Sequence, residues 1–144
     1  MPKLNKGERC IQIHHNREFH WVVSQQVYAQ SVVNLFDSLD HGARGELTSS
    51  LELQLSAIYG HQAKGQRLTF NDQQDQQKEG GSGCGLFPVA VATELCFGDD
   101  PNATPFNQAG LQNHLKNCFQ QMKINPFPKF CENAKTVGVR AAQQ

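Results

Sequence analysis

The sequence predicts a single α+β domain with a small mixed sheet of three to five strands flanked by helices. The main observation is the order of two patterns along the chain. Short runs rich in β-branched or aromatic residues predict strands, and longer runs with apolar residues at helical spacing predict helices. Along the chain they occur in the order strands, helix, strand, helix, helix. The length of 144 residues also suits one domain with one hydrophobic core.

Four segments are predicted to be strands because they are short and their apolar residues fit a partly buried sheet. They are residues 10–14, 20–24, 32–36 and 67–70. The polar run 15–18 suits a hairpin loop between the first two strands. The run 71–78 is rich in Gln and Asp and has no packing pattern, so it is predicted to be a loop.

Three segments are predicted to be helices from the spacing of their apolar residues. They are residues 46–59, 86–96 and about 107–122. The last helix is predicted to have one apolar face, formed by Leu111, Leu115, Cys118 and Phe119. Residues 10–128 are expected to form the domain, between a polar N-terminal tail, 1–9, and a flexible C-terminal tail, 129–144.

Composition excludes several classes of function. The chain has 13 basic and 13 acidic residues, so it lacks the basic excess of a nucleic-acid-binding domain. It has no apolar run of about 20 residues and no signal-peptide core, which predicts an intracellular protein that does not cross a membrane. The five cysteines form no C-x-x-C pair and the histidines are scattered, so no metal site and no cofactor are expected. Three cysteines are expected to be buried and reduced: Cys10, Cys96 and Cys118.

Cys84 lies in a glycine-rich turn, residues 80–85, directly before the predicted helix 86–96. The free N–H groups and the positive end of the helix dipole favour a thiolate at such a position. Glycines on either side also allow the backbone of a substrate to come close. The turn therefore makes Cys84 a candidate nucleophile, although a packed thiol at a helix start would look the same in the sequence.

A cysteine hydrolase also needs a base beside the thiolate and a group that orients the base. His20 begins the second predicted strand and Asp37 ends the third. Adjacent strands are ~4.8 Å apart, so these two side chains can meet if the strands pair. His14 and His15 offer an alternative base, but the apolar residues that follow His20 favour His20.

These residues resemble the ubiquitin-like-protein proteases, cysteine peptidases of the adenain-like, papain-related clan. The resemblance covers most of the chain. Within this family, the sequence is similar above all to short domains associated with invertebrate mobile elements. It rests on His20-Trp21, Phe36-Asp37-Ser38-Leu39, Gln76-Gln77, Gly81-Ser82-Gly83-Cys84-Gly85-Leu86-Phe87, Leu95-Cys96-Phe97-Gly98-Asp99-Asp100-Pro101, Phe106-Asn107-Gln108, His114-Leu115 and Pro126-Phe127-Pro128.

The resemblance implies a papain-like core without the N-terminal subdomain of larger members, and a Cys-His-Asp triad that cleaves after the Gly-Gly tail of a ubiquitin-like modifier. Cys84 would be the nucleophile, His20 the base and Asp37 the orienting acid. Gln77 or Lys78 would support the oxyanion. The tail would bind in a slot lined by Trp21, Gly81, Ser82 and Gly83. The chain would act as a monomer, with the modifier or its conjugates as partner.

Three residues depart from the family pattern and keep a second function open. Gly83 stands where the family has Asp, Lys78 stands where it has the oxyanion Gln, and Pro88 lies early in the helix that follows Cys84. A degenerate pseudoprotease that binds a ubiquitin-like protein without cleaving it is therefore the alternative. An acyltransferase of the same clan would need a basic cofactor surface, which this neutral chain does not offer.

Overall fold

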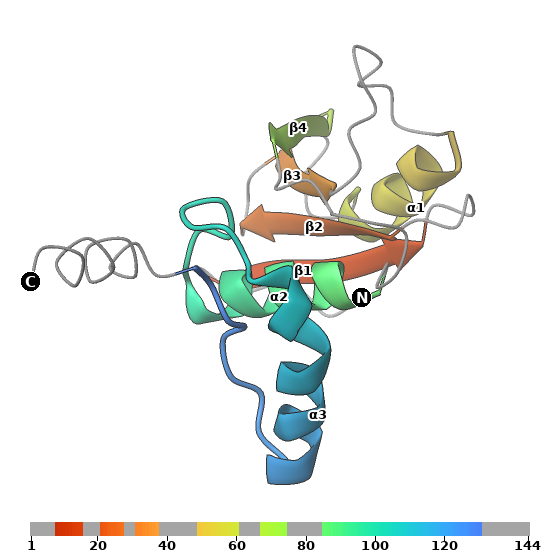
Figure 1. Ribbon diagram of the computed structural model, residues 1–144. Helices are drawn as coiled ribbons and strands as arrows, with labels where there is room; N and C mark the ends of the chain where they lie inside the picture. Colours follow the sequence, from red (N-terminus) through yellow and green to blue (C-terminus); the bar gives the residue numbers. More distant parts are fainter. Residues whose placement is uncertain are drawn as a thin grey trace, which may run out of the picture.

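The protein is an α+β domain in which helices cover both faces of a four-stranded mixed sheet, as seen in the computed structural model (Figure 1). The structure describes residues 8–15, 21–27, 31–37, 49–60, 67–74 and 85–130. Its elements are β1 (Arg9–His15), β2 (Trp21–Val27), β3 (Val32–Asp37), α1 (Ser49–Tyr59), β4 (Thr69–Gln74), α2 (Leu86–Phe97), the short 3-10 helix η1 (Gln108–Gly110) and α3 (Leu111–Gln121). The predicted α+β class, with a small mixed sheet flanked by helices, is confirmed.

The strands follow one another across the sheet in the order β1-β2-β3-β4. β1, β2 and β3 are antiparallel neighbours, whereas β4 lies parallel to β3. The connection between two parallel strands has to return to the starting end of the sheet, and α1 lies within this connection. The figure shows α1 on one side of the sheet and α2 on the other (Figure 1).

Side-chain alternation along the strands divides the core into two clusters. Val23 and Phe36 face each other across β2 and β3 and pack against α2, whereas Val22 and Leu35 point to the opposite face and pack against α1. The alternating residues of β2 therefore explain why a single strand stabilises both helices.

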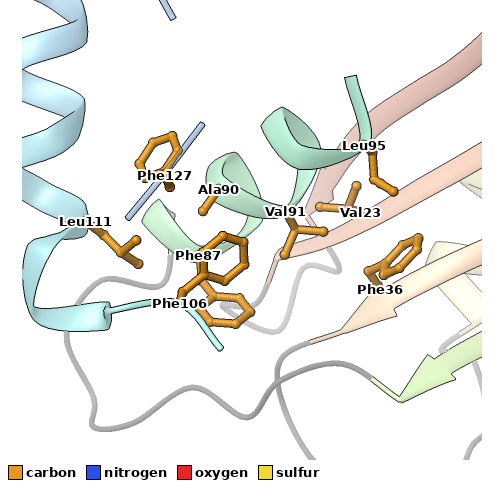
Figure 2. Packing of buried hydrophobic residues seen from close by; sticks show 9 residues of the cluster. All are labelled: Val23, Phe36, Phe87, Ala90, Val91, Leu95, Phe106, Leu111 and Phe127. Carbon is orange, nitrogen blue, oxygen red and sulfur yellow. The ribbon is translucent and has the colours of Figure 1, made fainter. Parts of the chain in front are cut away.

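The cluster on the α2 face extends beyond the sheet to the C-terminal part of the chain. Phe87 at the start of α2 packs edge to face on Phe106, with ring centroids 5.6 Å apart. Nine buried residues form this cluster (Figure 2): Val23, Phe36, Phe87, Ala90, Val91, Leu95, Phe106, Leu111 and Phe127. The segments that follow α2 are thus part of the same core.

Strand β4 is longer than predicted, because residues 71–74 continue the strand that was expected to end at 70. The cause is a set of polar contacts between neighbouring strands. The side-chain oxygen of Asn34 on β3 accepts hydrogen bonds from the amides of Asn71, at 3.4 Å, and Gln73, at 3.3 Å. Amide side chains thus replace the apolar contacts that a sequence pattern would reveal.

The predicted C-terminal boundary at residue 129 falls inside a packed segment. Lys129 forms a β-bridge with Phe106, and its Nζ lies 2.8 Å from Oε2 of the buried Glu94. The domain therefore extends at least to Phe130, the last residue that the structure describes.

Two predictions of burial are wrong. Phe119 was expected on the buried face of α3 but is 71% exposed, whereas Cys118, the residue before it, is buried, so the buried face of α3 is narrower than the apolar spacing predicts. Cys96 was expected in the core but lies exposed near the end of α2. Cys118 is buried as predicted, and Cys10 is half-buried.

Candidate active site

Trp21 and Asp37 lie at the same end of the sheet. Trp21 is the first residue of β2, Asp37 is the last residue of β3, and Asp37 pairs directly with Val22. The predicted pairing of the second and third strands is therefore confirmed. The half-buried Asp37 shares the α1 face with Val22, whereas Trp21 belongs with Val23 to the α2 face.

Helix α2 points its first turn toward this same end of the sheet. Its C-terminal residues, from Leu95 to Gly98, line a cavity of about 360 Å³ together with Arg9 and Ile11 from the beginning of β1. Since β1 runs from that cavity toward His15, α2 runs in the opposite direction to β1 (Figure 1). The start of α2 is thus directed to the end of the sheet where β1 ends and β2 begins, and the cavity is at the other end.

The beginning of α2 tolerates its proline. Gly85 is the N-cap residue, so Pro88 is the third residue of the helix. The first N–H groups of a helix have no partner within the helix, and a proline among them removes no hydrogen bond. Pro88 therefore belongs to the first turn, where it does not distort the helix.

Trp21 is held from one side and open on another. Its indole is 38% exposed and contacts the imidazole of His15, with ring centroids 4.8 Å apart at an interplanar angle of 61°. His15 is the residue directly opposite Trp21 in the pairing of β1 with β2. An exposed aromatic ring at the end of a sheet can serve as one wall of a binding slot.

Seven of the predicted site residues lie outside the part of the chain that the structure describes. They are His20, Gln77, Lys78, Gly81, Ser82, Gly83 and Cys84. Their roles stay predictions. The structure does describe the residues next to them, since Trp21 follows His20 and Gly85 follows Cys84.

His14 belongs to a buried hydrogen-bond chain that the sequence did not reveal. Its Nε2 lies 2.6 Å from Oγ of Ser24, and the same Oγ lies 2.5 Å from the hydroxyl of Tyr59 on α1. All three side chains are buried. His14 on β1, Ser24 on β2 and Tyr59 on α1 thereby join the helix to the sheet, and the imidazole of His14 is engaged in this contact on the α1 face.

Burial lowers the pKa of His14 below its usual 6.5 and raises that of the Tyr59 hydroxyl. The folded protein therefore keeps His14 neutral at a pH where the unfolded chain already takes up a proton. A group of this kind stabilises the fold above pH 6.5 and loses that contribution as the pH falls toward its lower folded-state pKa.

We therefore expect the free energy of unfolding to decrease below pH 6.5, by up to about 1.4 kcal/mol per pH unit from this residue. Urea unfolding at pH 7.5 and 5.5 measures the effect. His14→Gln should flatten the pH dependence, whereas His114→Gln, on α3, should keep it. An unchanged slope in His14→Gln would contradict this assignment.

Within the described ranges, no group of three or more His, Cys, Asp or Glu side chains could hold a metal ion. None of the helices in that part of the chain is long and apolar enough to cross a membrane.

Comparison with known proteins found no match among protein-family models, curated proteins or solved structures. The functional argument therefore rests on the residues and the geometry of this chain.

Proposed function

We propose that this protein is a cysteine peptidase or isopeptidase with a papain-like core, which cleaves after the Gly-Gly tail of a ubiquitin-like modifier. The observation that carries the proposal is the pairing of Val22 with Asp37. It brings the start of β2 and the end of β3 together at the end of the sheet toward which α2 points its first turn. The sequence puts His20 just before β2 and Cys84 just before α2.

The spacing along the chain suits contact between His20 and Asp37. His20 is two residues before Val22, and Val22 is directly opposite Asp37. Residues with this diagonal relation in neighbouring antiparallel strands are about 7–8 Å apart, within reach of long side chains. The Asp37 carboxylate would accept the proton of one imidazole nitrogen, which leaves the other nitrogen to act on the thiol.

The reaction would proceed in two steps. The Cys84 thiolate attacks the carbonyl carbon of the last glycine, and the oxyanion that forms accepts hydrogen bonds from the backbone N–H of Cys84 and the side chain of Gln77 or Lys78. The imidazolium of His20 then gives its proton to the leaving amine, and a thioester remains. Water, deprotonated by His20, attacks the thioester and releases the glycine carboxylate and the thiol.

The exposed indole of Trp21 would cover the tail of the modifier. A glycine-glycine segment has no side chains, so it can lie flat in a narrow slot beneath an aromatic ring. Any larger residue would clash there, and the slot would select its substrate by exclusion. The glycine turn formed by Gly81, Ser82 and Gly83 would leave room for the same tail.

The test is covalent labelling of the full chain with a panel of ubiquitin-like modifiers that each carry a C-terminal vinyl sulfone. We expect a single adduct by intact mass, absent in Cys84→Ala. Cys96→Ala is the matched control, because Cys96 is an exposed cysteine distant from the proposed site, and it should keep the adduct. A stable complex without an adduct would favour the pseudoprotease, and no Cys84-dependent adduct with any modifier would refute the peptidase.

A further inference from the structure

We propose that His15 is a positioning residue, which fixes the indole of Trp21 as the wall of the slot for the Gly-Gly tail; this rests on the proposed function. His15 has no assigned role in the triad or in the oxyanion site. It is nevertheless the residue paired with Trp21, and the two rings meet at 4.8 Å in an edge-to-face arrangement.

The position of His15 follows from strand alternation. Ile13 pairs with Val23, and Val23 packs against α2. His15 comes two residues after Ile13 and Trp21 two residues before Val23, so both also belong to the α2 face. His14, the neighbour of His15, points to the opposite face and bonds Ser24. The two adjacent histidines therefore serve different faces of the sheet.

The backbone at His15 is itself anchored. Its carbonyl oxygen accepts a hydrogen bond from Nε2 of Gln54 on α1, at 3.2 Å. The end of β1 is thus tied to a helix on the far side of the sheet, and the half-buried imidazole gives the indole a firm support. Since Trp21 is 38% exposed, the support leaves part of the indole open to a substrate.

An aromatic wall binds a flexible tail well only if the wall is ordered before the tail arrives. Without its partner ring, the indole would sample more rotamers, and binding would have to restrict them. The loss would fall on binding of the tail, whereas the chemistry at Cys84 would be unchanged once the tail is bound. The expected signature is a higher KM with an unchanged kcat.

Trp21 is the only tryptophan of the chain, so its fluorescence reports on this site directly and without any need for activity. We expect His15→Ala to increase the quenching of this fluorescence by acrylamide. We also expect it to raise KM for a Gly-Gly-tailed modifier, and the Kd of that modifier for the Cys84→Ala background, by about three- to tenfold. His15→Phe keeps an aromatic ring, so its KM and Kd should be close to those of the wild type.

His114→Ala is the matched control. It removes an imidazole of similar geometry, 4.7 Å from the ring of Phe127, at the base of α3. It should change neither the tryptophan fluorescence nor the KM. If His15→Ala leaves the fluorescence unchanged, or alters it without any effect on KM and Kd, the role of His15 is refuted while the peptidase stands. If the wild type neither binds nor cleaves any Gly-Gly-tailed modifier, the proposed function fails, and the role of His15 fails with it.

Discussion

Replacing Asp37 with Asn is expected to lower kcat/KM for a Gly-Gly-tailed substrate by about 10³–10⁴-fold. The carboxylate has two tasks in a triad: it selects the imidazole tautomer and it stabilises the imidazolium that forms. Asn has nearly the same size, but it carries no charge and can donate a hydrogen bond where the carboxylate only accepts one. The substitution should therefore remove the chemistry and keep the packing at the end of β3.

The loss should appear mainly in kcat, because Asp37 contacts no part of the tail in the proposed mechanism. Kinetics with a fluorogenic modifier measures it, and urea unfolding confirms that the variant folds. Asp99→Asn, at an exposed position just after α2, is the matched control and should retain full activity. A loss of less than tenfold in Asp37→Asn would show that His20 needs no acid partner.

The pairing that supports this prediction could be read from the sequence, because β2 and β3 each carry adjacent apolar residues, which a sheet buries on its two opposite faces. Strand β4 could not be read in the same way. Its residues 71–74 are all polar, and they join the sheet through backbone pairing with β3 and amide contacts to Asn34. Polar pairs of this kind have no periodicity that separates them from a loop.

The candidate site could be outlined from the sequence, but the side-chain contacts around its described residues could not. A cysteine at a helix start, with a histidine and an acid at strand ends, is a local pattern that a sequence shows. His15 is directly opposite Trp21 in the neighbouring strand, and His14 contacts Ser24 diagonally, because its own partner is Val22. These contacts become visible only when the register is known, because a shift by one residue would exchange the faces of both histidines.

The width of a buried helix face also limited the prediction of burial. In α3, Leu111 and Cys118 are buried, whereas Phe119, the residue after Cys118, is 71% exposed. Apolar spacing predicts which side chains lie on roughly the same side of a helix. It does not predict how wide a stripe of that side is covered.

The second large effect is expected for stability. Lys129→Met should lower the free energy of unfolding by about 3–5 kcal/mol, because it leaves the carboxylate of Glu94 buried without its cation. The Glu94 side chain is 4% exposed, and Lys129 Nζ is 2.8 Å from Oε2. The same ammonium lies 5.4 Å from the centre of the Phe106 ring, which adds a cation–π contact.

This ion pair connects the C-terminal half of α2 to the segment that follows α3, so its loss should weaken the packing of that segment on α2. Urea unfolding at pH 7 measures the change. The double variant Glu94→Gln/Lys129→Met removes the buried charge as well and should recover part of the stability, whereas Lys123→Met, at an exposed position, should change it by less than about 0.5 kcal/mol. If Lys129→Met costs no more than Lys123→Met, Glu94 is solvated after the change, and the segment is held by Phe127 and its apolar neighbours alone.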